Sequence, residues 1–137
     1  MLGFGCGSNA PDAIATTEPA ITPADALPML AISPSLSVSV QEDVLTALDA
    51  WRVATAGRVR YEARISDEPG ALAFVPRELE GGFAGRYGFD EAGHAVVWLA
   101  PFLADRRVVS RAASVQAIQH EVGHALRVSH LEAGFMP

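Results

Sequence analysis

The most restrictive feature of the sequence is a pair of histidines four residues apart, His120 and His124, with Glu121 between them. Positions i and i+4 lie one turn apart on the same face of an α-helix, so both imidazoles can reach one metal ion. Glu121 lies about 100° round the helix from His120, beside that ion rather than on it. This pattern predicts a helix that carries a zinc site and a neighbouring general base.

A long helix is expected over about 105–127, with two chemically different faces. Measured from His120, His124 lies at about 40°, Ala117 near 60° and Ala113 near 20°. The apolar residues lie between about 140° and 240°, and they are Val115, Ile118, Val122, Ala125 and Leu126. We therefore expect one face to pack on a sheet and the other to face a cleft. The alternative is that both histidines are ordinary polar-face residues, because short motifs recur by accident.

Length and charge limit the other classes of function. A chain of 137 residues is sufficient for one domain, and a charged fraction of 19% is typical of a globular protein. Ten arginines and no lysines leave a net charge of −6. This balance argues against nucleic acid or an anionic membrane as a partner, because phosphate binding needs clustered cations. We expect a monomer.

The first 34 residues are interpreted as a signal remnant followed by an Ala/Pro-rich arm, and residues 35–137 as the folded domain. The prolines of the arm disfavour a helix, and we expect no contribution to the core from it. Cys6, the only cysteine, is preceded by Gly5 and resembles the lipidated residue of a bacterial lipoprotein signal. The segment before it lacks a basic region and a long apolar stretch. Either the start is trimmed or misassigned, or the resemblance is accidental.

The apolar periodicity predicts an α+β domain. Alternation over 35–40 indicates a short strand, after which Ser39 and Glu42 fit a capping box at the start of a helix that ends at Gly57. Strands are expected over 58–65 and 71–75, and a hairpin over 83–89 and 94–100. The predicted fold is a small, twisted, mixed sheet with a backing helix and a zinc-site helix.

The third metal ligand determines which class of zinc enzyme the motif fits. Catalytic zinc usually takes three protein ligands and keeps one position for water. His130 follows His124 by six residues, so it can approach the metal only from a chain that has turned. The sequence HEVGHALRVSH over 120–130 resembles the motif of the metzincin clan, particularly its matrixin-like bacterial members.

The resemblance implies a zinc-dependent endopeptidase. In such an enzyme His120, His124 and His130 hold Zn²⁺, and a metal-activated water hydrolyses the peptide bond with Glu121 as the general base. Met136 corresponds to the Met-turn methionine that lies under the metal site. A peptide or protein substrate and a location outside the cell or in the bacterial envelope are implied, with Cys6 as a lipid anchor in the envelope case.

The resemblance also extends to two segments before the motif, and the chain departs from the family pattern at two points. Residues 81–85 are similar to the glycine-containing segment of the family, and 94–100 to the edge strand that binds extended peptide. Arg127 stands where the family usually has glycine, so either it bears a strained conformation or the turn differs and His130 misses the metal. The sequence stops at the Met-turn, so only a metzincin-like upper subdomain is expected, with the lower subdomain short or missing.

Other candidate ligands have simpler interpretations. His94 is expected to be a surface strand residue rather than a second-site ligand, and Asp90 and Glu91 to form a turn rather than a calcium site. Both tryptophans are expected in the core, and Arg106 and Arg107 in solvent. The alternative functions are a zinc-binding protein of this fold with little peptidase activity, and an intracellular helical protein with accidental histidines.

Overall fold

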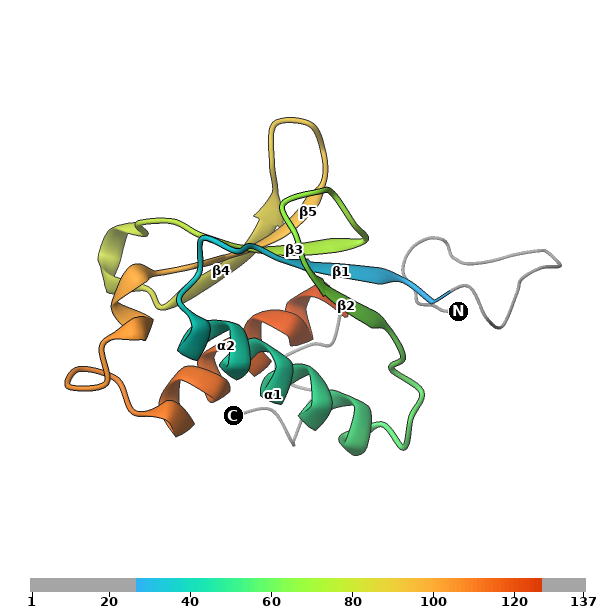
Figure 1. The fold of residues 1–137 in the computed structure, drawn as a ribbon, viewed down its shortest axis with the longest axis horizontal. Coiled ribbons are helices and arrows are strands. Elements are labelled where there is room, and N and C mark those ends of the chain that lie inside the picture. The colour runs from blue at the N-terminus through green and yellow to red at the C-terminus, as the bar shows by residue number, and fades with distance from the viewer. Residues whose placement is uncertain (1–26, 127–137) are drawn as a thin grey trace, which may run out of the picture.

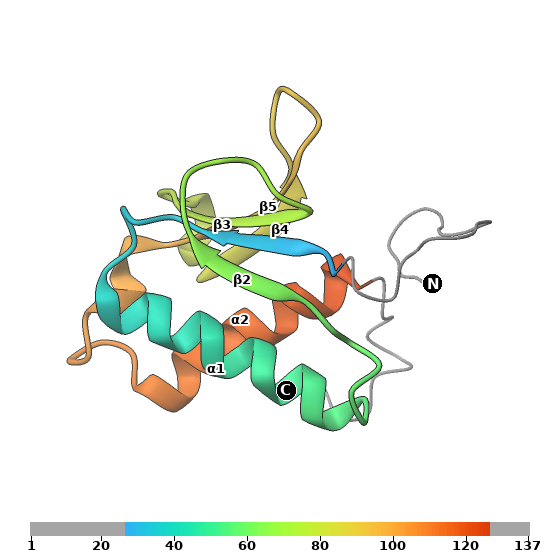
Figure 2. The same cartoon turned by 45° about the vertical axis from the view of Figure 1, so that its right-hand side comes forward.

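The computed structural model describes residues 27–126. This part of the chain has an α+β fold, in which two α-helices cover one face of a five-stranded mixed sheet (Figures 1 and 2). The strands are β1 (Met29–Ile32), β2 (Glu62–Ile65), β3 (Leu72–Pro76), β4 (Gly85–Phe89) and β5 (Ala95–Leu99). The helices are α1 (Val38–Ala54) and α2 (Arg111–Ala125), with short 3₁₀ turns η1 (Glu80–Gly82) and η2 (Pro101–Ala104). No helix of residues 27–126 is long and apolar enough to cross a membrane.

The strand order in the sheet is β2-β1-β3-β5-β4. All neighbouring pairs are parallel except β4 and β5, which form the predicted hairpin. The expected α+β class with a mixed sheet is therefore confirmed. The edge strand was predicted wrongly, because β5 lies between β3 and β4, and β4 forms the edge next to the site helix. Alternating burial in a hairpin does not reveal which of its strands gains a further neighbour.

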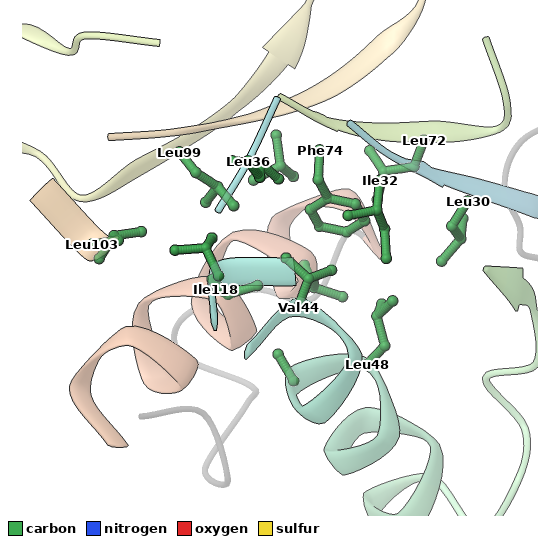
Figure 3. Close-up of a cluster of buried hydrophobic side chains, with 14 of the residues drawn as sticks. Leu30, Ile32, Leu36, Val44, Leu48, Leu72, Phe74, Leu99, Leu103 and Ile118 are labelled. Atoms are coloured by element: carbon green, nitrogen blue, oxygen red, sulfur yellow. The ribbon is translucent and has the colours of Figure 1, made fainter. Parts of the chain in front are cut away.

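The core fills the space between the sheet and the two helices (Figure 3). Ile32 and Phe74 project from the central strands, and each is fully buried. The helices contribute Val44 and Leu48 from α1 and Ile118 from α2. Burial of large aliphatic and aromatic side chains stabilises by about 1.5–3 kcal/mol each, so this layer fixes how α2 lies against the sheet.

The beginning of the fold differs from the prediction. Met29–Ile32 forms β1, at the centre of the parallel strands, so the last part of the proline-rich arm does supply core residues. The expected strand over 35–40 is absent because Pro34 follows β1 and a turn leads directly into α1. The cap is Ser37, whose hydroxyl accepts the Val40 N–H at 3.2 Å, rather than a box of Ser39 and Glu42.

Two further elements are shorter than predicted. The strand expected over 58–65 is paired only at Glu62–Ile65, and all of its residues are exposed because β2 is the other edge of the sheet. The half-buried residues expected on it, Val59 and Tyr61, precede β2 and pack against the core. Helix α2 begins at Arg111 rather than near residue 105, because a turn over 106–108 follows η2 and the helix cap is Ser110.

Candidate functional site

Helix α2 carries the candidate site on the side opposite its buried stripe. Ser110 caps the helix, its hydroxyl accepting the Ala113 N–H at 3.1 Å. Ile118 and Val122 are buried against the sheet and α1. The motif residues His120, Glu121 and His124 are only half-buried. The predicted separation of a packing face from an open face is therefore confirmed for this helix.

The two histidines lie close enough to share a metal ion. The Nε2 atoms of His120 and His124 are 3.2 Å apart, and the rings lie nearly perpendicular, with an interplanar angle of 82°. Two Zn–N bonds of usual length at a tetrahedral angle place the nitrogens about 3.3–3.4 Å apart. The spacing of the pair therefore fits zinc. It is also the spacing of an N–H···N hydrogen bond between a protonated and an unprotonated nitrogen.

Glu121 is hydrogen-bonded to the edge strand β4. Its Oε1 accepts the backbone N–H of Tyr87 at 2.9 Å. Beside this contact lies Gly85, at which a Cβ atom would stand 3.1 Å from Glu121 Cγ and 3.4 Å from Leu99 Cδ2. Glycine thus permits the close approach of β4 to α2 at this point.

The hydrogen bond from Tyr87 also shows which residues of β4 point their backbone N–H and C=O groups away from β5. Arg86 and Gly88 pair with β5 opposite Trp98 and Val96. In an antiparallel pair, alternate residues direct both N–H and C=O to the partner strand, and the others direct them away. The backbone N–H and C=O of Tyr87 therefore face away from β5, toward α2 and its Glu121.

A cleft of about 700 Å³ lies between β4 and α2. Its helical wall contains both histidines, the glutamate and the small Ala117, as predicted, whereas Ala113 is exposed and does not line it. Its strand wall is formed by Phe83, Ala84, Gly85, Arg86 and Tyr87. Residues 83–85 of this wall belong to the glycine-containing segment identified from the resemblance, whereas Arg86 and Tyr87 were not predicted as site residues.

Several predicted site residues lie outside the described part of the chain. These are His130, Met136, Arg127 and Cys6. Within residues 27–126, no group of three His, Cys, Asp or Glu side chains could hold a metal ion. The described residues therefore supply the pair from α2, and the third ligand stays a prediction.

His94 lies on the surface, as expected for the simpler interpretation. It follows the β4–β5 turn, where Asp90 Oδ1 accepts the N–H groups of Ala92 and His94 at 3.0 and 2.8 Å. These bonds, first that from His94, hold the pKa of Asp90 below its usual value. The imidazole Nδ1 lies 3.5 Å from the other carboxylate oxygen. The predicted turn is thus confirmed.

The start of α2 is fixed by a buried aspartate that the sequence interpretation missed. Asp43 is 1% exposed, and its Oδ2 accepts hydrogen bonds from Arg106 Nη2 at 2.5 Å and Ser114 Oγ at 2.6 Å. Its Oδ1, which makes no hydrogen bond among the described residues, lies 3.7 Å from Arg111 Nε. The expectation that Arg106 is merely solvated was wrong, because the charge of Asp43 requires a partner when buried. The available signal was a carboxylate beside Val44 in the buried stripe of α1.

The tryptophans divide between core and surface. Trp51 is 3% exposed, and its indole N–H donates to the carbonyl of Gln119 at 2.8 Å, next to the first histidine. Trp98 was expected in the core but is only half-buried, on the sheet face away from the helices. There the guanidinium of Arg77 lies 4.8 Å from the centre of its ring.

Comparisons with known proteins leave the family open. No protein-family model matches the chain, and no curated protein matches it. Among solved structures, one described as the GM1-bound form of the ECX AB5 holotoxin is similar with a TM-score of 0.47 and 12% identity. The match covers 70% of this chain and 49% of that one, so this chain spans about half its length. A likeness of this strength assigns neither fold family nor activity.

Proposed function

We propose that this chain is a zinc-dependent endopeptidase of the metzincin type. The observation that carries the proposal is the pair of Nε2 atoms of His120 and His124, 3.2 Å apart on the wall of a cleft, with Glu121 on the same wall. The resemblance of residues 120–130 to the metzincin motif supplies His130 as the third ligand. The edge strand beside the helix supports a metzincin-like upper subdomain.

The chemistry follows from what each side chain is able to do. Zn²⁺ held by the three imidazoles would supply an activated water and polarise the scissile carbonyl. Glu121 accepts the proton of the attacking water and returns it to the leaving amine. The Tyr87 N–H orients the carboxylate of Glu121 in the absence of substrate, and its position on β4 places the reacting groups next to a strand edge.

The same strand edge favours peptide over other substrates. An extended peptide adds to a sheet edge through its backbone, which gives affinity without demanding one sequence. The backbone groups of Tyr87 face away from β5, and a bound strand would replace Glu121 as the acceptor of the Tyr87 N–H. The substrate class that fits is therefore an extended segment of an unfolded protein or a loop.

The first test compares Glu121→Gln with the unchanged protein. We expect both to bind one Zn²⁺ per chain, because Glu121 lies beside the ion, while cleavage of an unfolded protein falls by about 10²–10⁴-fold. Metal analysis and mass spectrometry of the digest measure the two quantities. Glu91→Gln, in the exposed β4–β5 turn, is the matched control and retains full activity. Loss of zinc from Glu121→Gln shows that the general-base assignment is wrong.

The second test concerns the ligands. His124→Ala and His130→Ala should each lose stoichiometric zinc, whereas His94→Ala should retain it. Retention of zinc by His130→Ala removes the metzincin assignment and leaves a site built on α2 alone. Stoichiometric zinc without any chelator-sensitive cleavage supports instead a zinc-binding protein with little peptidase activity.

A further inference from the structure

Arg86 stands at the rim of the cleft on the sheet face away from α2. Side chains alternate along a strand, and the neighbouring Gly85 faces Glu121, so Arg86 projects to the opposite face. There it lies opposite Trp98 in the β4–β5 register and also lines the cleft. Its guanidinium carbon is 5.6 Å from the ring centre of Phe83, within the range of a cation–π interaction.

No carboxylate among residues 27–126 pairs with this arginine. The ion pairs that arginines form in this part of the chain join Arg52 to Asp49, Arg107 to Asp105, and both Arg106 and Arg111 to Asp43. Stacking on an aromatic ring orients the planar guanidinium and leaves its N–H donors for a bidentate acceptor. In a chain with net charge −6, the rim of the cleft therefore presents a preoriented cation with no acidic partner in this part of the chain.

The strand geometry indicates where a peptide side chain would meet it. Tyr87 directs its backbone groups outward, so its neighbour Arg86 occupies a non-hydrogen-bonded position relative to a strand added antiparallel at the outer edge. Side chains facing each other at such positions are closest, and opposite charges there attract. The position lies beside the residue whose N–H contacts Glu121, and therefore close to the bond to be cleaved.

We propose that Arg86 makes the cleft selective for extended peptides that carry an Asp or Glu side chain opposite it, next to the scissile bond. This inference rests on the proposed peptide substrate of the same cleft. The carboxylate accepts hydrogen bonds from the guanidinium, and the Phe83 ring holds that guanidinium in place. A glutamine at the same position retains the size but not the charge.

The test measures peptide binding rather than cleavage. A single glutamate is scanned along an uncharged, fluorescently labelled peptide, and binding to zinc-loaded Glu121→Gln is compared with the corresponding glutamine series. We expect one position at which glutamate binds about threefold to fivefold more tightly, the range of an exposed ion pair. Adding Arg86→Glu should reverse the preference toward lysine at that position, and adding Arg86→Lys should retain it.

Arg77→Glu is the matched control, because Arg77 stacks on Trp98 and does not line the cleft. It should leave the preference unchanged, and circular dichroism checks that each variant is folded. The inference is overturned if glutamate and glutamine bind equally at every position, or if the peptides do not bind at all. It is also overturned if the preference for glutamate survives Arg86→Glu. Cleavage by the unchanged protein without acidic preference removes this inference alone. Acidic preference in binding with no cleavage by the unchanged protein removes the peptidase and leaves the selective cleft.

Discussion

The two ends of helix α2 are built in opposite ways. Its first turns are tied to α1 by a buried charge network, in which Asp43 binds Arg106 and Ser114. Its last turns carry half-buried histidines and a glutamate that face a cleft. Between them, Trp51 binds the carbonyl of Gln119 and joins the helix to α1 once more.

This difference indicates that the helix is positioned by contacts the chemistry does not use. Because the buried hydrogen bonds of Asp43 and Trp51, together with the burial of Ile118 and Val122, fix the axis, the site residues need not be buried to be well placed. A ligand pair must stay accessible to metal and substrate, so we expect substitutions of the pair to lower the free energy of unfolding less than substitution of Asp43 does. Changes at the two ends should therefore separate stability from site geometry.

The largest effect is expected from Asp43→Ala. It removes two hydrogen bonds and the partner of Arg106, whose side chain is 33% exposed and can be rehydrated in part. We expect the free energy of unfolding to fall by about 2–3 kcal/mol, measured by denaturant titration. Below the unfolding transition the variant should still bind zinc as the unchanged protein does.

The control is Asp49→Ala, on the same helix. Asp49 pairs with Arg52 at 2.6 Å, but both side chains are about half exposed, so the change in stability should be below about 1 kcal/mol. Equal destabilisation by the two alanine variants would contradict the contrast between the ends of α2.

A smaller effect is expected from Trp51→Phe, at the junction of the two halves. The variant loses the hydrogen bond to Gln119 and part of a buried ring, so we expect a loss of about 1–2 kcal/mol of stability. Because Gln119 precedes His120, zinc affinity should also fall a few-fold, measured by competition with a chelator. Unchanged zinc affinity would mean that the Trp51–Gln119 hydrogen bond positions only the first half of helix α2.

The smallest effect on stability is expected from Gly85→Ala, at the cleft. The new methyl group would stand 3.1 Å from Glu121 Cγ, so the side chain must shift and its bond to the Tyr87 N–H weakens. Hydrogen exchange at the Tyr87 amide should become about fivefold faster, with stability changed by about 1 kcal/mol or less.

The comparison variant is Gly88→Ala on the same strand. Its methyl group would meet the Trp98 ring at 2.8 Å, on the other face of the sheet. Gly88→Ala should lower the free energy of unfolding more than Gly85→Ala does. It should leave the Tyr87 amide protected from hydrogen exchange. Faster exchange at Tyr87 in this variant would show that the contact with Glu121 depends on the whole strand.

Local patterns predicted the elements whose residues carry a strong period or a turn signal. The hairpin around the Asp90–Gly93 turn and the two faces of the site helix follow from alternation and helical spacing. β1 was missed because the short run Met29–Ile32 lies among prolines and has no period of its own. Its burial comes from pairing with β2 and β3, which are distant in sequence.

By itself, the sequence determined that His120, His124 and Glu121 share the open side of one helix, because helical spacing alone fixes that relation. Only the tertiary structure decided that β4 rather than β5 lies beside them, and that Tyr87 and Arg86 complete the cleft wall. It also decided that Asp43 anchors the start of the helix. These contacts join residues far apart in the chain, and they depend on how strands order in a sheet and how helices pack on it, which no local pattern encodes.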